Sequence, residues 1–395
     1  MKAITPLHRI HGLDTLRALA IVLVFANHHL LFVSKASPFG WLGEIGWIGV
    51  DLFFGLSGYL IGNQIFAAMR TQEGLSLPVF YARRFLRTLP NFYVVLALYA
   101  CWPWFRHGAP MPPLWEFLTF TQNINLTPGT AFSHAWSLCV EEQFYVLLPA
   151  AALLIGMVRR PLLVGWLAII GALAGGAAIR ASLWDDGMAQ QGGFHFYNLI
   201  YYASWCRFDE LVAGVALALL KNYHGAAWTR LTSHGNAAFG VGALLFGLAC
   251  RVFYDDHYGH GVTVFGYPLL ALAVFVLLVA ALSPGGLLAR TRIPGAQSLA
   301  LWSYAIYLLH KQLCILLKPE LQELGLAPDT SASTAVMAAA SIAAGWLLYA
   351  VVETPFMKLR DRWFPANTRR ALVTAAFRSR RTAPAYRPPG TPAGH

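Results

Sequence analysis

The chain has 395 residues, of which 57% are hydrophobic and only 12% are charged. Soluble domains carry about 25% charged residues, and several apolar runs here reach the roughly 20 residues that cross a hydrocarbon core. A soluble fold is therefore excluded. The net charge of +11 raises the question of a nucleic-acid partner, and the positions of the charges have to answer it.

Taken in chain order, the apolar segments predict an all-α polytopic membrane protein with ten transmembrane helices. The segments cover 16–33, 47–67, 91–106, 137–157, 161–180, 206–221, 237–254, 264–282, 299–318 and 334–353. The third and the sixth are short and have charged residues at their ends. The first has no small-residue cleavage site after it, so we expect a retained helix and not a signal peptide. We expect residues 1–365 to form one transmembrane domain and the basic, Pro-rich residues 366–395 to form a disordered cytoplasmic tail.

The charges follow this topology. With both termini placed in the cytoplasm, most Lys and Arg residues fall in inner loops and most acidic residues fall in outer ones. This is the positive-inside asymmetry of membrane proteins. The basic charge therefore sets orientation, and we expect no nucleic-acid partner. The five cysteines are scattered without metal-binding spacing, so we expect neither a disulfide framework nor a metal site.

Ionisable residues inside membrane spans are costly and usually functional, and the first such pair is Arg17 and His28. The two lie 11 residues apart in LDTLRALAIVLVFANHH. On an α-helix this spacing puts them within about 20° of one face and about 16 Å apart along the axis. Such a face suits a long ligand with an anionic head and a reactive tip, with imidazole as a general base. The alternative is an interfacial arginine and a histidine that only packs.

A second cluster, Arg83, Arg84 and Arg87 in VFYARRFLRTLP, is predicted on the inner side. Their i, i+3 and i, i+4 spacing brings the guanidinium groups together, and such a fork suits phosphate groups. A cytoplasmic anchor that contacts anionic lipid fits the same residues.

A third cluster, Glu141 and Glu142 in HAWSLCVEEQFYVLLP, enters what we predict to be the outer end of a span. A carboxylate beside an imidazole orients it and stabilises its charged form. An ordinary acidic pair in an outer loop is the alternative, and the flanking aromatic residues speak against it because they indicate burial.

Two further groups are candidates for acceptor binding. Arg207 and Asp209 follow the aromatic stretch FHFYNLIYYASW, where rings and carboxylates suit a sugar, although an aromatic belt at the membrane interface fits too. In SYAIYLLHK, the residues Tyr307 and His310 form part of a polar stripe with Tyr304, which is also consistent with packing.

Together these clusters resemble the acyltransferase-3 family of integral-membrane acyltransferases, with the matches in order along almost the whole chain. The matching segments are HGLDTLRALAIVLVFANHH with its Arg-x10-His spacing, GWIGVDLFFGLSGYLIG, YARRFLRTLP, HAWSLCVEEQFYVLLP, RFDELVAGVALA, SYAIYLLH and VVETPFMK. One departure is Cys139, where relatives commonly carry Ser. The family has about ten helices, which agrees with the independent count of spans.

The resemblance implies an O-acyltransferase that moves an acyl group, most often acetyl, from cytoplasmic acyl-CoA to a hydroxyl of a cell-envelope or secreted glycan, such as an O-antigen or an exopolysaccharide. It implies a multi-pass protein of the bacterial inner membrane that uses no metal. Many larger relatives add a periplasmic SGNH hydrolase-like domain; nothing here resembles it, so we expect the membrane domain to act alone or to pass the acyl group to another protein. The alternative class is a transporter or flippase of a lipid-linked or acylated sugar, with the buried charges as a proton relay.

The resemblance also assigns roles to the clusters. Arg17, Arg83, Arg84 and Arg87 would bind the CoA phosphates, and His28 would act as general base or as a transient acyl carrier. Glu142 or Glu141 would orient His28 or bind the acceptor. We expect the remaining acceptor contacts from Arg207, Asp209, Ser137, Tyr307 and His310.

Overall fold

The computed structural model describes residues 10–35 and 38–365, and the predicted tail, 366–395, lies outside them. Within these residues, eight helical segments are long and apolar enough to cross a membrane. They match eight of the predicted spans and confirm the all-α polytopic fold. Their bounds are His11–Ser34, Trp41–Met69, Ser133–Gly156, Pro161–Leu183, Gly235–Asp255, Val262–Leu282, Ala296–Glu323 and Ser331–Trp363.

The other two predicted spans correspond to helices that are not among these eight, because they are too short or too polar. They are α4 (Leu77–Cys101) and α9 (Asp209–Tyr223). The predicted bounds of α4, 91–106, were wrong: the helix begins at Leu77, with a proline in its first turn, where the missing N–H of proline is tolerated. Its first turns are polar, so hydropathy alone did not include them. The arginines predicted on the inner side therefore lie on a helix that packs against the bundle.

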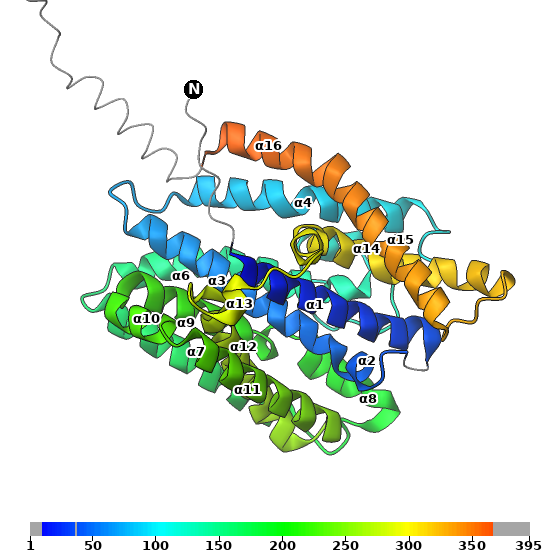
Figure 1. Ribbon diagram of the computed structural model, residues 1–395, viewed down its shortest axis with the longest axis horizontal. Coiled ribbons are helices and arrows are strands. Elements are labelled where there is room, and N and C mark those ends of the chain that lie inside the picture. The colour runs from blue at the N-terminus through cyan, green and yellow to red at the C-terminus, as the bar shows by residue number, and fades with distance from the viewer. Residues whose placement is uncertain (1–9, 36–37, 366–395) are drawn as a thin grey trace, which may run out of the picture.

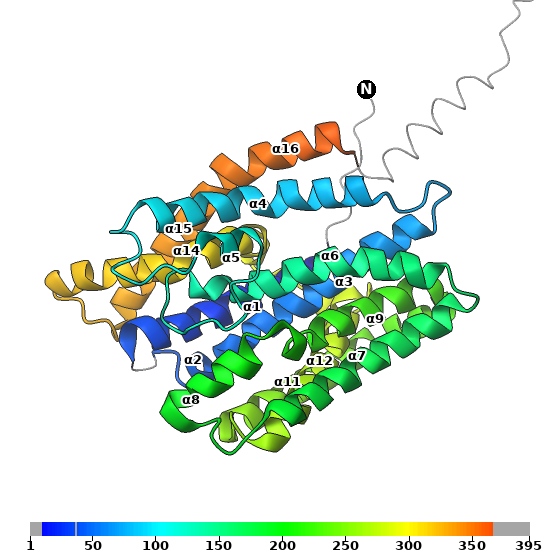
Figure 2. The same ribbon diagram turned by 180° about the vertical axis from the view of Figure 1, so that it is seen from behind.

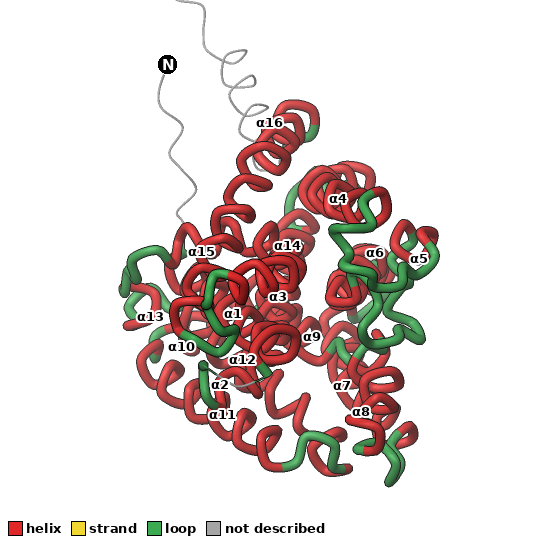
Figure 3. Tube along the Cα trace, turned by 90° about the vertical axis from the view of Figure 1, so that its right-hand side faces the viewer, coloured by secondary structure: helices red, strands yellow, loops and turns green. Residues whose placement is uncertain are grey.

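The long helices run side by side along the long axis of the molecule (Figure 1). Seen along that axis, α1 (His11–His29) and α3 (Gly49–Met69) lie in the middle, while α4, α11 (Gly235–Asp255) and α16 (Thr354–Trp363) lie at the periphery (Figure 3). From behind, α6 (Trp136–Gly156) and α7 (Pro161–Leu183) cover the bundle (Figure 2). The central core is completed by α9, α12 (Tyr267–Leu282) and α14 (Ala296–Glu323).

Small residues let the central helices approach each other. A Cβ on Gly58 of α3 would lie 2.0 Å from the carbonyl oxygen of Leu211 on α9, and one on Gly214 of α9 would lie 2.3 Å from the carbonyl oxygen of Gly55. Such close contacts are how helices associate in a membrane, where lipid is as apolar as leucine. The outer helices behave differently: Leu167 on α7 is 57% exposed and Leu244 on α11 is 74% exposed, as expected of surfaces that face lipid.

In the part of the chain that the structure describes, short helices and four π-helical turns connect these elements. The short helices are α2 (Trp41–Ile45), α5 (Leu114–Leu118), α8 (Gln190–Phe196), α10 (Gly225–Thr232) and α13 (Leu287–Arg290), and α15 (Ser331–Leu348) leads through a π turn into α16. One π turn, Leu30–Ser34, extends α1 directly after His29, and another, Tyr197–Tyr201, follows α8. Such turns are frequent at functional sites. We name the two ends of the bundle after α1: the Arg17 end, where it begins, and the His28 end, where it finishes.

Candidate active site

Two cavities enter the bundle from its opposite ends. The cavity at the Arg17 end has a volume of about 530 Å³ and lies among α1, α3, α4, α6, α14 and α16. The cavity at the His28 end has a volume of about 300 Å³, and its lining includes Asn27, His28, His134 and Lys311. Both volumes are typical of small-molecule sites.

The Arg17-end cavity is strongly basic. Its charged lining consists of the arginines Arg17, Arg83, Arg84, Arg87 and Arg360 and the glutamates Glu141, Glu142 and Glu353. All four arginines predicted to bind phosphate are therefore brought together around one cavity. Within the described residues, no carboxylate lies within ion-pair distance of Arg17 or Arg87, whereas Arg83 contacts Asp361 at 3.3 Å.

Glu141 and Glu142 lie at this same cavity. The guanidinium of Arg84 is 3.9 Å from the Glu141 carboxylate and 3.8 Å from the Glu142 carboxylate. Ser57 and Tyr145 donate hydrogen bonds to Glu141 at 3.1 and 2.7 Å. The glutamates contact Arg84 because both lie more than one turn into α6 and face α4. The structure therefore joins this pair to Arg84, and among the described residues it does not bring either carboxylate to His28.

The partner of His28 is His310. Their ring nitrogens, Nδ1 of His28 and Nε2 of His310, lie 2.8 Å apart, and the rings are parallel with an interplanar angle of 4°. On its other side, Nδ1 of His310 lies 3.0 Å from the carbonyl oxygens of both Ile306 and Tyr307. His310 thus joins α14 to α1 and does not project alone into a binding cavity.

These contacts assign the tautomers. A carbonyl oxygen only accepts, so Nδ1 of His310 carries a proton and donates it, which leaves Nε2 of His310 as an acceptor. Nδ1 of His28 must then be the donor in the bond between the two rings. The assignment follows from the hydrogen-bond network, and it leaves Nε2 of His28 with a free lone pair. A neutral imidazole with one nitrogen held and the other free is the arrangement of a general base.

Two residues beside this pair, His134 and Lys311, were not among the site residues predicted from the sequence. The His134 ring lies 6.0 Å from those of both His28 and His310. The Nζ of Lys311 lies 2.8 Å from Oγ of Ser133. Both residues fall inside segments that did attract notice, HAWSL and SYAIYLLHK, so the available signal was proximity in sequence to the residues that were chosen.

Ser137 and Tyr307 line the Arg17-end cavity and separate it from the other one. The Tyr307 hydroxyl donates a hydrogen bond to the carbonyl oxygen of His134 at 2.7 Å, and it lies 2.7 Å from Oγ of Ser137. Since Tyr307 and Ser137 line the first cavity and His134 lines the second, this pair forms a thin polar wall between the two. The prediction put Ser137 and Tyr307 at the acceptor, and in the structure both line the Arg17-end cavity.

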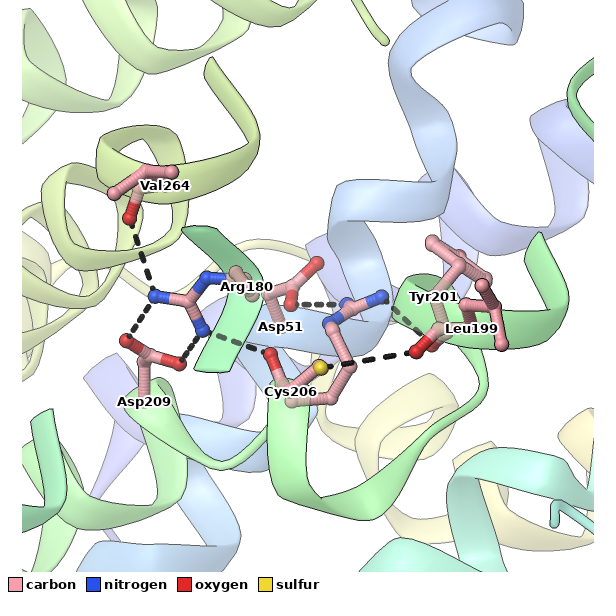
Figure 4. Close-up of polar contacts among 8 residues, drawn as sticks. Asp51, Arg180, Leu199, Tyr201, Cys206, Asp209 and Val264 are labelled. Atoms are coloured by element: carbon pink, nitrogen blue, oxygen red, sulfur yellow. Dashed lines mark hydrogen bonds and ion pairs between the residues drawn. The ribbon is translucent and has the colours of Figure 1, made fainter. Parts of the chain in front are cut away.

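Arg207 and Asp209 line neither cavity. Arg207 is fully buried and bonded to Asp51 at 2.6 Å, and Asp209 is fully buried and bonded to Arg180 at 2.6 Å. Figure 4 shows the Asp51 and Asp209 carboxylates each directed at a guanidinium group. The prediction put both residues at the acceptor, whereas the structure pairs them inside the core, with Asp51 on α3 and Arg180 on α7, as charges buried in an apolar core require.

Arg207 nevertheless contacts aromatic residues that form the wall of the His28-end cavity. Its guanidinium carbon lies 4.4 Å from the ring centroid of Tyr201, 5.2 Å from Trp136 and 5.9 Å from Trp47, and all three rings line that cavity. Stacking on a desolvated cation fixes such rings in place. Burial, with the charge of Arg207 acting in the same direction, also lowers the pKa of His257 to about 4, which keeps this further lining residue neutral.

Within residues 10–35 and 38–365, no group of three His, Cys, Asp or Glu side chains is arranged to hold a metal ion. The polar groups that line the two cavities include imidazole, guanidinium, carboxylate, hydroxyl, ammonium and amide groups. What the geometry offers is a basic cavity, a wall of hydroxyls, and a second cavity with a free imidazole nitrogen and aromatic walls.

Comparison with known proteins places this arrangement in context. A family model described as an acyltransferase domain matches residues 10–350. The chain is 30% identical over 225 residues to the peptidoglycan O-acetyltransferase OatA of Listeria monocytogenes, which covers 53% of this chain and 33% of that protein. It is 29% identical over 341 residues to the putative peptidoglycan O-acetyltransferase YrhL of Bacillus subtilis, covering 80% of this chain and 50% of that one.

A third relative is more similar in length. The putative membrane-bound transacylase BcsY of Komagataeibacter xylinus is 26% identical over 322 residues, covering 77% of this chain and 73% of the relative. The chain thus spans only a third to a half of the first two relatives. No solved structure matches the chain.

Proposed function

Since the chain belongs to the acyltransferase family whose model matches residues 10–350, we propose that this membrane acyltransferase O-acetylates a glycan. The donor is acetyl-CoA, which enters at the Arg17 end, and the acceptor is a hydroxyl of a cell-envelope or secreted glycan, which enters at the His28 end. The observation that carries the proposal is the pair of cavities that meet at the wall of Ser137 and Tyr307, with the free His28 nitrogen beside it.

The Arg17 end is the cytoplasmic face in this proposal, and the membrane is the bacterial inner membrane. The loops at that end are rich in arginine, as the positive-inside rule requires of a cytoplasmic face. These loops lie at the Arg17 end because the helices that they connect meet there: the beginning of α1 contacts the end of α12, and the end of α6 contacts the end of α3. The arginines are Arg70, Arg159, Arg160, Arg290 and Arg292.

The Arg17-end cavity suits the donor. CoA carries a pyrophosphate and a further phosphate, and Arg17 and Arg87 line the cavity with no carboxylate of the described residues within ion-pair distance. A guanidinium group can bind a phosphate through two parallel N–H···O hydrogen bonds. Glu141 and Glu142 offset the charge of Arg84 and hold it against Tyr145, whose ring centroid is 3.8 Å from the guanidinium carbon. Phe53 and other apolar residues on the wall suit the pantetheine arm.

The reaction needs one base at the junction. Nε2 of His28 takes the proton of the acceptor hydroxyl, whose oxygen attacks the thioester carbonyl carbon. The carbon–sulfur bond breaks, the acetyl ester forms, and the CoA thiolate receives the proton from His28. His310 is a positioning residue in this scheme, because its bond to Nδ1 holds His28 in the tautomer with a free Nε2. Direct transfer leaves no acetyl group on the protein; an acetyl-imidazole trapped at His28 would instead make it a transient carrier.

The His28-end cavity suits a sugar. Its walls are rich in aromatic rings, and the flat faces of sugar rings pack on them while the hydroxyls meet polar groups. The lining rings are Phe32, Trp47, Trp136, Tyr197, Tyr201, Tyr202, Phe253, Tyr254 and Tyr258.

The test is glycan mass spectrometry on cells that carry His28→Gln. We expect the acetyl groups on the envelope or secreted glycan to disappear as they do in a deletion strain, at equal protein abundance. The matched control is His29→Gln, because His29 contacts Thr334 at 3.4 Å and does not line either cavity. Acetylation that persists at the wild-type level in His28→Gln contradicts the mechanism. In proteoliposomes, gradient-driven sugar uptake without loss of acetyl-CoA would support the transporter instead.

A further inference from the structure

Lys311 places a buried positive charge at the His28-end cavity. It follows His310 on α14, is 6% exposed and lines the cavity. Its Nζ donates a hydrogen bond to Oγ of Ser133 at 2.8 Å and lies 4.1 Å from the ring centroid of Phe32. The charge of Lys311 has no role in the acetyl transfer that we propose for His28.

Among the described residues, no carboxylate pairs with this ammonium group, and the acidic residue that lines the same cavity, Glu44, is not within ion-pair distance of it. An ammonium group has three N–H donors, and in the described chain its one hydrogen-bond acceptor is a neutral hydroxyl, with no carboxylate within ion-pair distance. The buried arginines Arg180 and Arg207 differ from Lys311 because each has a carboxylate at 2.6 Å. Burying a charge without a partner is costly, so an anion that enters the cavity has much to gain from contact with Lys311.

We propose that Lys311 binds an anionic group of the acceptor glycan, a carboxylate or a phosphate, and so makes the enzyme selective for acidic sugars. This inference rests on the proposed function and names its substrate class more closely. Because Lys311 adjoins His310 and its partner Ser133 adjoins His134, the anion lies next to the imidazoles that activate the hydroxyl. A cavity of about 300 Å³ lies at the lower end of the range for small-molecule sites, so both groups belong to one sugar or to two neighbouring sugars.

Position also favours the acceptor over the reacting thioester as the partner of Lys311. The α14 helix runs from the Arg17 end to the His28 end, so Lys311 lies beyond Tyr307 and the wall through which the donor reaches His28. Its Nζ contacts Phe32, which lies beyond His28 on the extension of α1. A role at the tetrahedral oxyanion is the competing outcome of the test.

The experiment measures binding and turnover separately on the purified protein in detergent. The probes are trigalacturonate and its methyl ester, in which methyl groups replace the negative charges, and maltotriose with and without a terminal phosphate, which separates a phosphate source from a carboxylate source. Binding is followed by tryptophan fluorescence, since Trp47 and Trp136 line the cavity. Turnover is followed as CoA release from acetyl-CoA. The variants are Lys311→Met, which removes the charge, Lys311→Arg, which keeps it, and Lys318→Met, a control on the same helix outside the cavity.

We expect the wild type to bind an acidic probe at least about tenfold more tightly than its neutral counterpart, the worth of one charged hydrogen bond. Lys311→Met should lose that preference, while Lys311→Arg and Lys318→Met should keep it. Equal binding of charged and neutral probes by the wild type overturns the inference. So does a loss of kcat in Lys311→Met that is the same for both probes at unchanged Kd, since it puts the ammonium at the reacting oxygen. Charge-selective binding without acetyl transfer would contradict the proposed function and leave this inference standing.

Discussion

Replacing His310 by phenylalanine should lower the turnover number and spare donor binding. The substitution keeps an aromatic ring on α14 and removes the nitrogen that accepts the 2.8 Å hydrogen bond from Nδ1 of His28. Without that acceptor, nothing in the described chain holds the proton on Nδ1, and His28 also populates the tautomer whose Nε2 carries the proton and cannot act as a base.

The size of the effect follows from the bond that is lost. A hydrogen bond contributes about 0.5–1.5 kcal/mol net, which changes the ratio of the two tautomers by about 2- to 13-fold. We therefore expect kcat to fall in His310→Phe, by at most about tenfold. Removing the base itself in His28→Gln should cost about 10²–10⁴-fold. The KM for acetyl-CoA should stay the same in both variants, because the arginines that line the donor cavity are unchanged.

The assay is acetyl transfer by purified protein at saturating acetyl-CoA, with His310→Gln as the conservative variant. A glutamine Oε1 can take the place of the imidazole Nε2 as acceptor, so His310→Gln should recover most of the activity that His310→Phe loses. If both variants lose equally, or if His310→Phe loses as much as His28→Gln, the orienting role is refuted. An increase in the KM for acetyl-CoA in His310→Phe would point to general damage to the fold.

Three further outcomes are expected. Gly58→Ala should lower the thermal unfolding midpoint in detergent, because its Cβ would lie 2.0 Å from a carbonyl oxygen of α9 and overpacking costs about 1–3 kcal/mol; Gly171→Ala, whose Cβ meets nothing within 4 Å, should not lower it, and equal midpoints would contradict the packing. Asp51→Asn should destabilise the protein by about 3–5 kcal/mol by leaving its arginine partner buried without a counter-charge, and Asp255→Asn, which breaks an exposed pair, by at most about 1 kcal/mol; similar denaturation midpoints would refute this. Arg87→Gln should raise the KM for acetyl-CoA about tenfold but not that for S-acetylpantetheine, which lacks the phosphates, and an equal rise for both would remove Arg87 from the phosphate site.

Most of the membrane fold could be predicted because hydropathy reports directly on transfer into lipid. The prediction of α4 (Leu77–Cys101) went wrong where that link fails: its first turns carry polar side chains that face a cavity, and a hydropathy window reads them as a loop. The π turns, such as Leu30–Ser34 after His29, have no hydropathy signal at all.

The candidate site could be predicted as a list of residues and not as a set of pairs. Helical spacing put Arg17 and His28 on one face of α1, and both do line cavities. Spacing within one helix does not say which residue on another helix is the partner. Glu141 was expected near His28 and lies at Arg84, and the His28 partner proved to be His310. Arg207 was expected at the acceptor because charge in a membrane suggests function, whereas its pairing with a distant aspartate satisfies it inside the core.

The central claim is that donor and acceptor reach His28 from opposite ends of the bundle. The most direct measurement uses proteoliposomes with radiolabelled acetyl-CoA sealed on the Arg17 side and, on the other side only, the glycan identified by mass spectrometry. We predict labelled glycan on the far side, none with His28→Gln, and no labelled acetyl-CoA crossing the membrane. Label that appears in the glycan only when donor and acceptor share one side would contradict the account.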